Sequence, residues 1–129
     1  MKVKACALIK RGGNILIIKR ASEDSYCPGL WDLPSGDVLP NETIKETLSR
    51  EVMEETNLKI KTAEFSSVWE EKSEKERILG LVFTCSVLSN KVKLSIEHDE
   101  FKWIPKKELN KFTFTYATKE SILKSNLFV

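Results

Sequence analysis

Cysteine, net charge and long apolar runs are all scarce in this sequence of 129 residues. Its three cysteines are widely spaced and form no CxxC or Cys/His cluster, which excludes a disulfide framework and a structural zinc site and indicates a reducing compartment. The first apolar stretch, residues 5–9, is too short for the core of a signal peptide, and no later run approaches a membrane span. We therefore expect a cytoplasmic protein without a membrane segment.

The charge balance narrows the possible partners. The sequence has 21 basic and 19 acidic residues and a formal charge of +2, so its long-range field attracts neither a nucleic acid polymer nor a membrane surface. Any phosphate recognition must be local. With no internal repeat, low-complexity tract or linker-like segment, residues 1–129 are expected to form a single domain, as a monomer or a homodimer.

Apolar and turn-forming residues follow an order typical of an α/β domain. Two apolar runs, 3–10 and 14–20, flank Gly12-Gly13 and predict an antiparallel hairpin. A long ordered loop follows, with a short strand expected near 30–33. Further strands are expected at 58–71, 77–88, 91–96 and 100–105, and helices at 43–56 and 115–124. This order predicts a mixed β-sheet between helices, an α/β/α sandwich.

The helix at 43–56 has the clearest signals. Its apolar side chains recur at every fourth position: Ile44, Leu48 and Val52. Either Asn41 or Thr43 is available as its N-cap, and Asn57 can end it in a left-handed conformation.

Three glutamates crowd the last turns of this helix: Glu51, Glu54 and Glu55. At about 100° per residue they continue the apolar stripe, so the usual interpretation of a charge run as a solvated face does not fit. The carboxylates repel one another and the helix dipole, and Arg50 can neutralise only one of them. With no His or Cys nearby, an oxygen-only site favours a hard divalent cation, Mg²⁺ first and Mn²⁺ second.

Residues 36–58, GDVLPNETIKETLSREVMEETNL, resemble the box that defines the Nudix hydrolases, G-x5-E-x7-R-E-U-x-E-E-x-G-U with U apolar. The matching residues are Gly36, Glu42, Arg50, Glu51, Val52, Glu54, Glu55 and Leu58. Asn57 replaces the family's glycine, a mild change because asparagine also adopts the left-handed conformation. Upstream, ILIIKR and PGLWDLPSG resemble the strand and turn that lead into the box, with Ser35 in place of the turn's usual first glycine.

The resemblance implies a Nudix-type fold and Mg²⁺-dependent hydrolysis of a nucleoside diphosphate linked to a group X, by attack of water on phosphorus. It assigns the metal to three carboxylates and one backbone carbonyl: Glu51, Glu54, Glu55 and Ser35. Arg50 would orient the carboxylates through a salt bridge that includes Glu42. The residues it implies for catalysis are Glu51, Glu54, Arg50 and Glu100. Arg20 and Gly36 are the implied substrate contacts.

The general base is open between a glutamate of the box and Glu97 or Glu100 on a later loop, where ordinary surface charge explains both equally well. His98 lies between them and can titrate near neutrality, although a lone loop histidine is more often exposed to solvent. Tyr26 and Trp69 are the aromatic candidates for stacking on a nucleobase. Most other aromatic residues are expected in the core.

Several activities fit this pattern. The leading one is hydrolysis of a nucleoside triphosphate, as in MutT-like enzymes that remove oxidised nucleotides, although residues 113–121 lack the expected purine-reading asparagine. ADP-ribose or a nucleotide sugar is the alternative substrate. A non-catalytic nucleotide-binding module disagrees with the complete set of box carboxylates, which only cost stability without a cation. A charged scaffold helix without metal would leave thermal stability unchanged by Mg²⁺.

Overall fold

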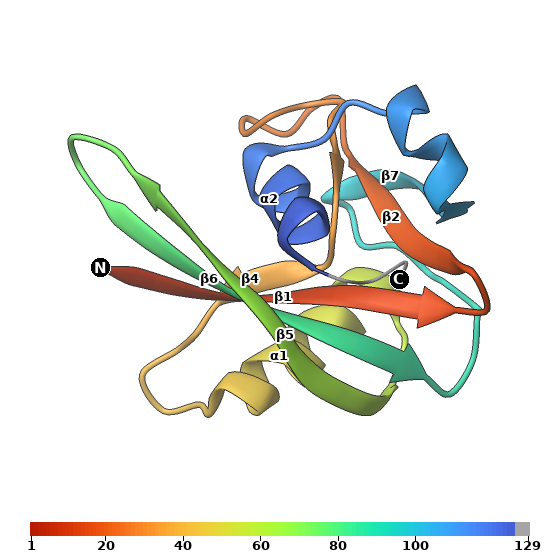
Figure 1. Ribbon diagram of the computed structural model, residues 1–129, viewed down its shortest axis with the longest axis horizontal. Helices are drawn as coiled ribbons and strands as arrows, with labels where there is room; N and C mark the ends of the chain where they lie inside the picture. The colour runs from red at the N-terminus through yellow and green to blue at the C-terminus, as the bar shows by residue number, and fades with distance from the viewer. Residues whose placement is uncertain (126–129) are drawn as a thin grey trace.

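The computed structural model describes residues 1–125 and shows a central sheet between two α-helices (Figure 1). The strands are β1 (Lys2–Arg11), β2 (Asn14–Arg20), β3 (Trp31–Asp32), β4 (Ser35–Asp37), β5 (Ile60–Lys72), β6 (Arg77–Val87) and β7 (His98–Pro105). The helices are α1 (Ile44–Thr56), α2 (Tyr116–Lys124) and the short 3₁₀ helix η1 (Lys106–Lys111). Over this part of the chain, no helix has the length and apolarity needed to cross a membrane.

The sheet is mixed, as the sequence predicts. Its main path runs β3-β2-β1-β6-β5, while β4 pairs with β1 and β7 pairs with β2. β1 and β6 are parallel, and the other pairs are antiparallel. β1 therefore joins the half of the sheet that contains β5 and β6 to the half that contains β2, β3 and β7.

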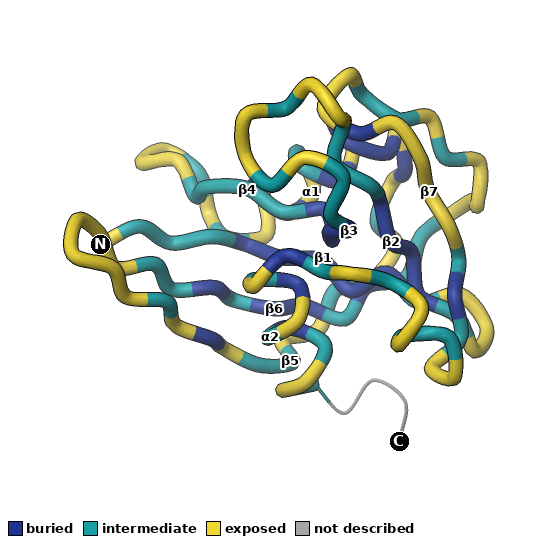
Figure 2. The backbone as a smooth tube through the Cα atoms, turned by 90° about the horizontal axis from the view of Figure 1, so that it is seen from above, coloured by how far each residue is buried: buried dark blue, intermediate teal, exposed yellow. Residues whose placement is uncertain are grey.

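Successive residues of β1 belong to two different cores, one on each face of the sheet. Ala7 and Ile9 pack in the cluster that includes Val52 of α1. Leu8, on the opposite face, packs in a second cluster, against which Ile122 of α2 is placed. Figure 2 shows the buried stretches along β1 and β2 and the exposed loops at their ends. The α/β/α sandwich expected from the sequence is confirmed.

Local signals in the sequence place the hairpin turn and the first helix correctly. Gly12 has a φ of 60° in the turn between β1 and β2. Thr43, rather than Asn41, is the N-cap of α1: its hydroxyl accepts a hydrogen bond from the Glu46 N–H, and the Glu46 carboxylate accepts one from the Thr43 N–H. Asn57 ends the helix with a φ of 62°. The closing helix predicted from residue 115 is also present as α2.

Residues 91–96 are not the strand that their alternating pattern predicts. Val92 and Leu94 pack against the core on the α1 side of the sheet, whereas Ile96 is exposed. The backbone N–H groups of Lys93 and Ser95 donate to the carbonyls of Thr56 and Glu55, at 2.9 and 3.4 Å. These carbonyls belong to the last turn of α1, which has no partners of its own for them. The segment completes a helix end instead of a sheet.

Two short elements were not expected. β4 has only three residues and η1 only six, too few for a hydrophobic period to show in the sequence. The short strand predicted near 30–33 is limited to Trp31–Asp32, and the last strand begins at His98 rather than at Glu100.

Trp69 belongs to the core and does not stack on a ligand. It pairs with Gly80 across β5 and β6 and is 1% exposed. A methyl group on Gly80 would overlap the indole ring, so the glycine makes room for the tryptophan.

Replacing Gly80 with alanine should lower the Tm by roughly 5–10 °C, because overpacking of this kind costs about 1–3 kcal/mol. Gly13→Ala is the matched control, since an added methyl there meets nothing within 4 Å. Thermal unfolding of both variants checks the prediction. Equal Tm values would contradict the tight packing of Trp69 on Gly80.

Candidate active site

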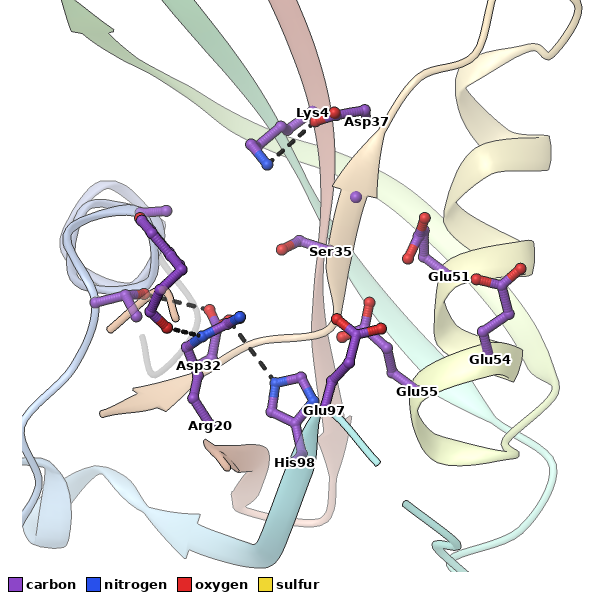
Figure 3. A pocket seen from close by; sticks show the side chains of 14 residues that line it. Lys4, Arg20, Asp32, Ser35, Asp37, Glu51, Glu54, Glu55, Glu97 and His98 are labelled. Carbon is purple, nitrogen blue, oxygen red and sulfur yellow. Dashed lines mark hydrogen bonds and ion pairs between the residues drawn. The ribbon is translucent and has the colours of Figure 1, made fainter. Parts of the chain in front are cut away.

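A cavity of about 330 Å³ lies beside the C-terminal half of α1. Four glutamates form one side, which we call the carboxylate wall: Glu51, Glu54, Glu55 and Glu97. Four residues form the other side, which we call the braced wall: Arg20, Tyr26, Asp32 and His98. Figure 3 shows the α1 glutamates facing the cavity from the helix, with Arg20, Asp32 and His98 across from them.

The glutamates of α1 differ in their burial. Glu55 is 7% exposed, whereas the side chain of Glu54 is 57% exposed at the rim of the cavity. Burial, and next the adjacent Glu51 carboxylate, raise the pKa of Glu55 well above its usual range. Two carboxyl groups this close in a buried place need a proton or a cation between them. Glu55 thus faces inward, as its position on the apolar stripe of the helix predicts.

The carboxylate wall itself presents only oxygen atoms, which suit a hard divalent cation. Within residues 1–125, no three acidic, histidine or cysteine side chains are already arranged to hold a metal ion. In this arrangement Arg50 compensates the charge instead: its Nη1 donates to Glu51 Oε1 at 2.8 Å and lies 3.4 Å from Glu54 Oε2. A bound cation would take over part of that compensation.

Arg50 also makes the predicted salt bridge to Glu42, which is confirmed. Its Nε and Nη2 donate to the two Glu42 carboxylate oxygens at 2.7 and 2.9 Å. These bonds, together with one from the Thr47 hydroxyl, lower the pKa of Glu42 to about 2. Arg50 is thereby held in place from outside the cavity, and it holds Glu51 in turn.

Gly36 lies where β4 passes α1. A methyl group at this position would overlap the Glu51 side chain, so only glycine lets the strand approach the carboxylate this closely. Ser35 lines the cavity next to it, and both residues are fixed by the pairing of β4 with β1, where Ser35 lies opposite Cys6.

Arg20 lines the cavity, but its guanidinium is engaged on three sides. It donates to Asp24 Oδ2 at 2.7 Å, to Asp32 Oδ2 at 3.1 Å and to the backbone carbonyl of Tyr26 at 2.7 Å. It also lies over the Tyr26 ring, 5.0 Å from its centroid. Arg20, expected from the resemblance to contact substrate, braces the loop after β2 in this structure.

Asp32 is the buried centre of the braced wall. Its Oδ1 accepts hydrogen bonds from the Leu33 N–H and from the hydroxyls of Thr115 and Thr118, at 2.8 to 3.2 Å. Burial alone would raise the pKa of Asp32, but His98, Thr118 and Arg20 together hold it below the usual range. Thr115 is the N-cap of α2, so this carboxylate ties β3 to the second helix.

The structure separates the two later glutamates. Glu97 lines the cavity, whereas Glu100 lies outside it, opposite Lys19 on β2, with ion pairs of 3.9 Å to Lys19 and 3.8 Å to Lys102. The pairing of β7 with β2 shifts register between Lys19 and Arg20 and holds Glu100 opposite Lys19, whereas Glu97 lies just before the strand. Glu97 is therefore the glutamate of this stretch that belongs to the carboxylate wall.

His98 is not the exposed loop residue that its sequence context favours. It starts β7, pairs with Arg20 in the sheet and is 4% exposed. Tyr26, the other aromatic stacking candidate, stays 55% exposed at the rim of the cavity.

Sequence reasoning missed Lys4, Asp32 and Thr115, all of which line the cavity. Lys4 forms an ion pair of 3.1 Å with Asp37 across β1 and β4. Only Asp32 carried a signal, as a lone acidic residue between apolar neighbours in LWDL. Lys4 and Thr115 gave no such signal, because they reach the cavity only when the fold brings β1 and the start of α2 beside it.

Comparisons with known proteins agree with this geometry. The NUDIX domain model matches residues 1–124. The nucleoside triphosphatase NudI from Escherichia coli O1:K1 is 27% identical, with 91% of each chain covered.

Solved structures include a MutT protein from Methanosarcina mazei Go1, with a TM-score of 0.81, 30% identity and coverage of 95% of this chain and 90% of that one. A MutT NUDIX hydrolase from Burkholderia pseudomallei has a TM-score of 0.85 and 25% identity, with 95% and 96% covered. Nudix hydrolases generally use a divalent metal. Because the family model spans nearly the whole chain and the box residues meet at one cavity, this protein belongs to the Nudix hydrolase family and is a pyrophosphohydrolase.

Proposed function

We propose that the protein hydrolyses a phosphoric anhydride bond of a nucleoside triphosphate, with Mg²⁺ as its preferred cation and Mn²⁺ as a substitute. The observation that carries this proposal is the carboxylate wall, in which buried Glu55 and its neighbour Glu51 can both be ionised only beside a cation. The names of the relatives, a nucleoside triphosphatase and two MutT proteins, support the substrate class. The cation would neutralise phosphate charge and acidify the attacking water.

The residues of the cavity have separate roles in this proposal. Glu51, Glu54 and Glu55 hold the cation with the backbone carbonyl of Ser35. Arg50, fixed by Glu42, positions the first two of these carboxylates. Gly36 leaves room for Glu51 beside β4. Glu97 accepts the proton of the water that attacks phosphorus, and the leaving group departs as a nucleotide or a phosphate.

A substrate panel tests the activity. Nucleoside triphosphates, ADP-ribose, nucleotide sugars and dinucleoside polyphosphates are each incubated with Mg²⁺, with Mn²⁺ and with EDTA, and the products are separated by ion exchange. We expect the highest kcat/KM for a nucleoside triphosphate and no turnover in EDTA. Preference for ADP-ribose or a nucleotide sugar would move the protein to another substrate class of the same family.

Glu97→Gln should lower kcat by about 10²-fold or more, because it removes the proposed base from the cavity. Glu100→Gln is the matched control in the same stretch, and its kcat should stay within about twofold of the wild type, since surface substitutions outside a site have small effects. Steady-state rates with saturating Mg²⁺ measure both. A larger loss in Glu100→Gln than in Glu97→Gln would return the role to Glu100.

We further propose that residues 1–129 act as one catalytic domain in a reducing, cytoplasmic compartment. The three cysteines are free thiols, and both walls of the cavity come from one sheet, helix α1 and the loops that connect them.

A further inference from the structure

Among the described residues, the buried side chain of His98 has no hydrogen-bond partner. Its side chain is 2% exposed, and within residues 1–125 neither ring nitrogen has a hydrogen-bond partner. Its Nε2 lies 3.9 Å from Asp32 Oδ2, too far for a hydrogen bond. Unpaired polar atoms in this position cost stability, so the imidazole is placed for a group that binds in the cavity it lines.

The position of His98 between the two walls indicates which part of a substrate it meets. Figure 3 shows the imidazole between Asp32 on one side and Glu55 and Glu97 on the other. Two backbone hydrogen bonds hold the loop that precedes His98. The Ala21 N–H donates to the Glu97 carbonyl at 2.9 Å, and the Ser95 N–H donates to the Glu55 carbonyl. His98 thus stands at the junction of the metal-binding half of the cavity and the remaining half.

The braced wall beyond His98 offers no unpaired charge to a phosphate. Arg20 is shared between Asp24 and Asp32, so this half of the cavity has no excess of positive charge. Tyr26 contributes an exposed aromatic ring at the rim. A surface without excess positive charge and with an accessible ring suits the nucleoside half of a nucleotide better than its phosphates.

In a nucleoside triphosphate the ribose always lies between the phosphates and the base. If the phosphates take the carboxylate wall with the cation, the ribose must pass the junction where His98 stands. We propose that His98 hydrogen-bonds a hydroxyl group of the substrate ribose and so selects the sugar. This proposal rests on the proposed function, and it assigns to His98 a binding role rather than proton transfer.

The test combines variants of His98 with substrates that lack one hydroxyl. The wild type, His98→Leu and His98→Gln are assayed with a nucleoside triphosphate and with its 2′-deoxy and 3′-deoxy analogues, in saturating Mg²⁺. Loss of the contacted hydroxyl should raise the KM of the wild type about 5- to 20-fold, and should leave the KM of His98→Leu unchanged. His98→Gln, which keeps a donor and an acceptor, should recover part of the difference.

Two readouts separate a binding role from a structural one. The Tm of His98→Leu should equal or exceed that of the wild type, because the substitution removes unpaired buried nitrogens. Inorganic tripolyphosphate, which has no sugar, should inhibit the wild type and His98→Leu with the same constant. A lower Tm together with a weaker tripolyphosphate constant would make His98 structural and overturn the proposal.

Other outcomes are equally decisive. If removal of either hydroxyl raises the KM of His98→Leu by the same factor as the KM of the wild type, His98 does not contact the ribose. If the wild type turns over no nucleoside triphosphate at all, the proposed function fails first. In that case the dissociation constants of the same nucleotides, measured with Mg²⁺, replace KM. If the effect of removing a hydroxyl on these constants is the same in the wild type and in His98→Leu, the ribose contact is overturned independently.

Discussion

Glu51→Gln is expected to lower kcat/KM by about 10³-fold or more, which corresponds to about 4 kcal/mol of transition-state stabilisation. Glu51 has more connections than the other glutamates of the wall. It is bonded to Arg50 at 2.8 Å, lies against Gly36 and faces Glu55. The amide keeps the size of the side chain but cannot supply the charge that a cation requires.

The comparison needs an ordinary glutamate as a control. Glu64, exposed on β5 and outside the cavity, serves this purpose, and Glu64→Gln should stay within about twofold of the wild-type rate. Circular dichroism and thermal unfolding show whether each variant is folded. A folded Glu51→Gln enzyme with wild-type turnover would remove the carboxylate wall from the mechanism.

Mg²⁺ should stabilise the wild type and leave Glu55→Gln nearly unaffected. At a cation concentration about 100 times the dissociation constant, binding to the folded state alone contributes about 2.7 kcal/mol, a Tm increase of roughly 5–10 °C. Glu55→Gln removes a buried ligand and should lose most of this increase. Differential scanning calorimetry with and without Mg²⁺ measures it, with Glu64→Gln as the control that responds like the wild type.

The same carboxyl group gives the metal-free protein a pH dependence. Because the pKa of Glu55 is raised in the folded state, the unfolded chain loses this proton first as the pH rises past about 4.3. The stability of the metal-free protein should therefore fall from that pH upward until the folded group also ionises. Glu55→Gln should lack this decline. Glu42, with its pKa lowered to about 2, acts in the opposite direction and loses its stabilising effect only as the pH falls toward 2.

An unchanged Tm on addition of Mg²⁺ and Mn²⁺, in a wild-type protein that is otherwise folded, would contradict the cation site. It would favour a helix whose charges are compensated by Arg50 alone.

Sequence signals within a few residues of each other predicted the structure well. The Thr43 cap and the Asn57 stop of α1, the turn at Gly12 and the bridge from Arg50 to Glu42 all depend on neighbours along one helix or hairpin. The box motif brought its carboxylates to a single cavity for the same reason, since a helix fixes their relative directions.

Sequence patterns did not predict the contacts that depend on residues far away in the chain. Residues 91–96 alternate like a strand, but the free carbonyls at the end of α1 take their hydrogen bonds. Glu100 and Glu97 look equivalent until the fold places Glu97 at the cavity and Glu100 opposite Lys19 on β2. Arg20 lines the cavity as expected, but its bond to Asp32 could not be predicted. Each case concerns which groups meet, and composition and spacing do not record that.

The bonding of residues 93 and 95 to the last turn of α1 has a consequence for engineering. Glu97 lies only two residues after this attachment, and β7 begins at the next residue, so a peptide inserted there would separate the two sides of the catalytic centre. The exposed tip of the β5–β6 hairpin, around Ser73 to Lys75, holds no residue of the cavity. A reporter or affinity sequence belongs at that tip.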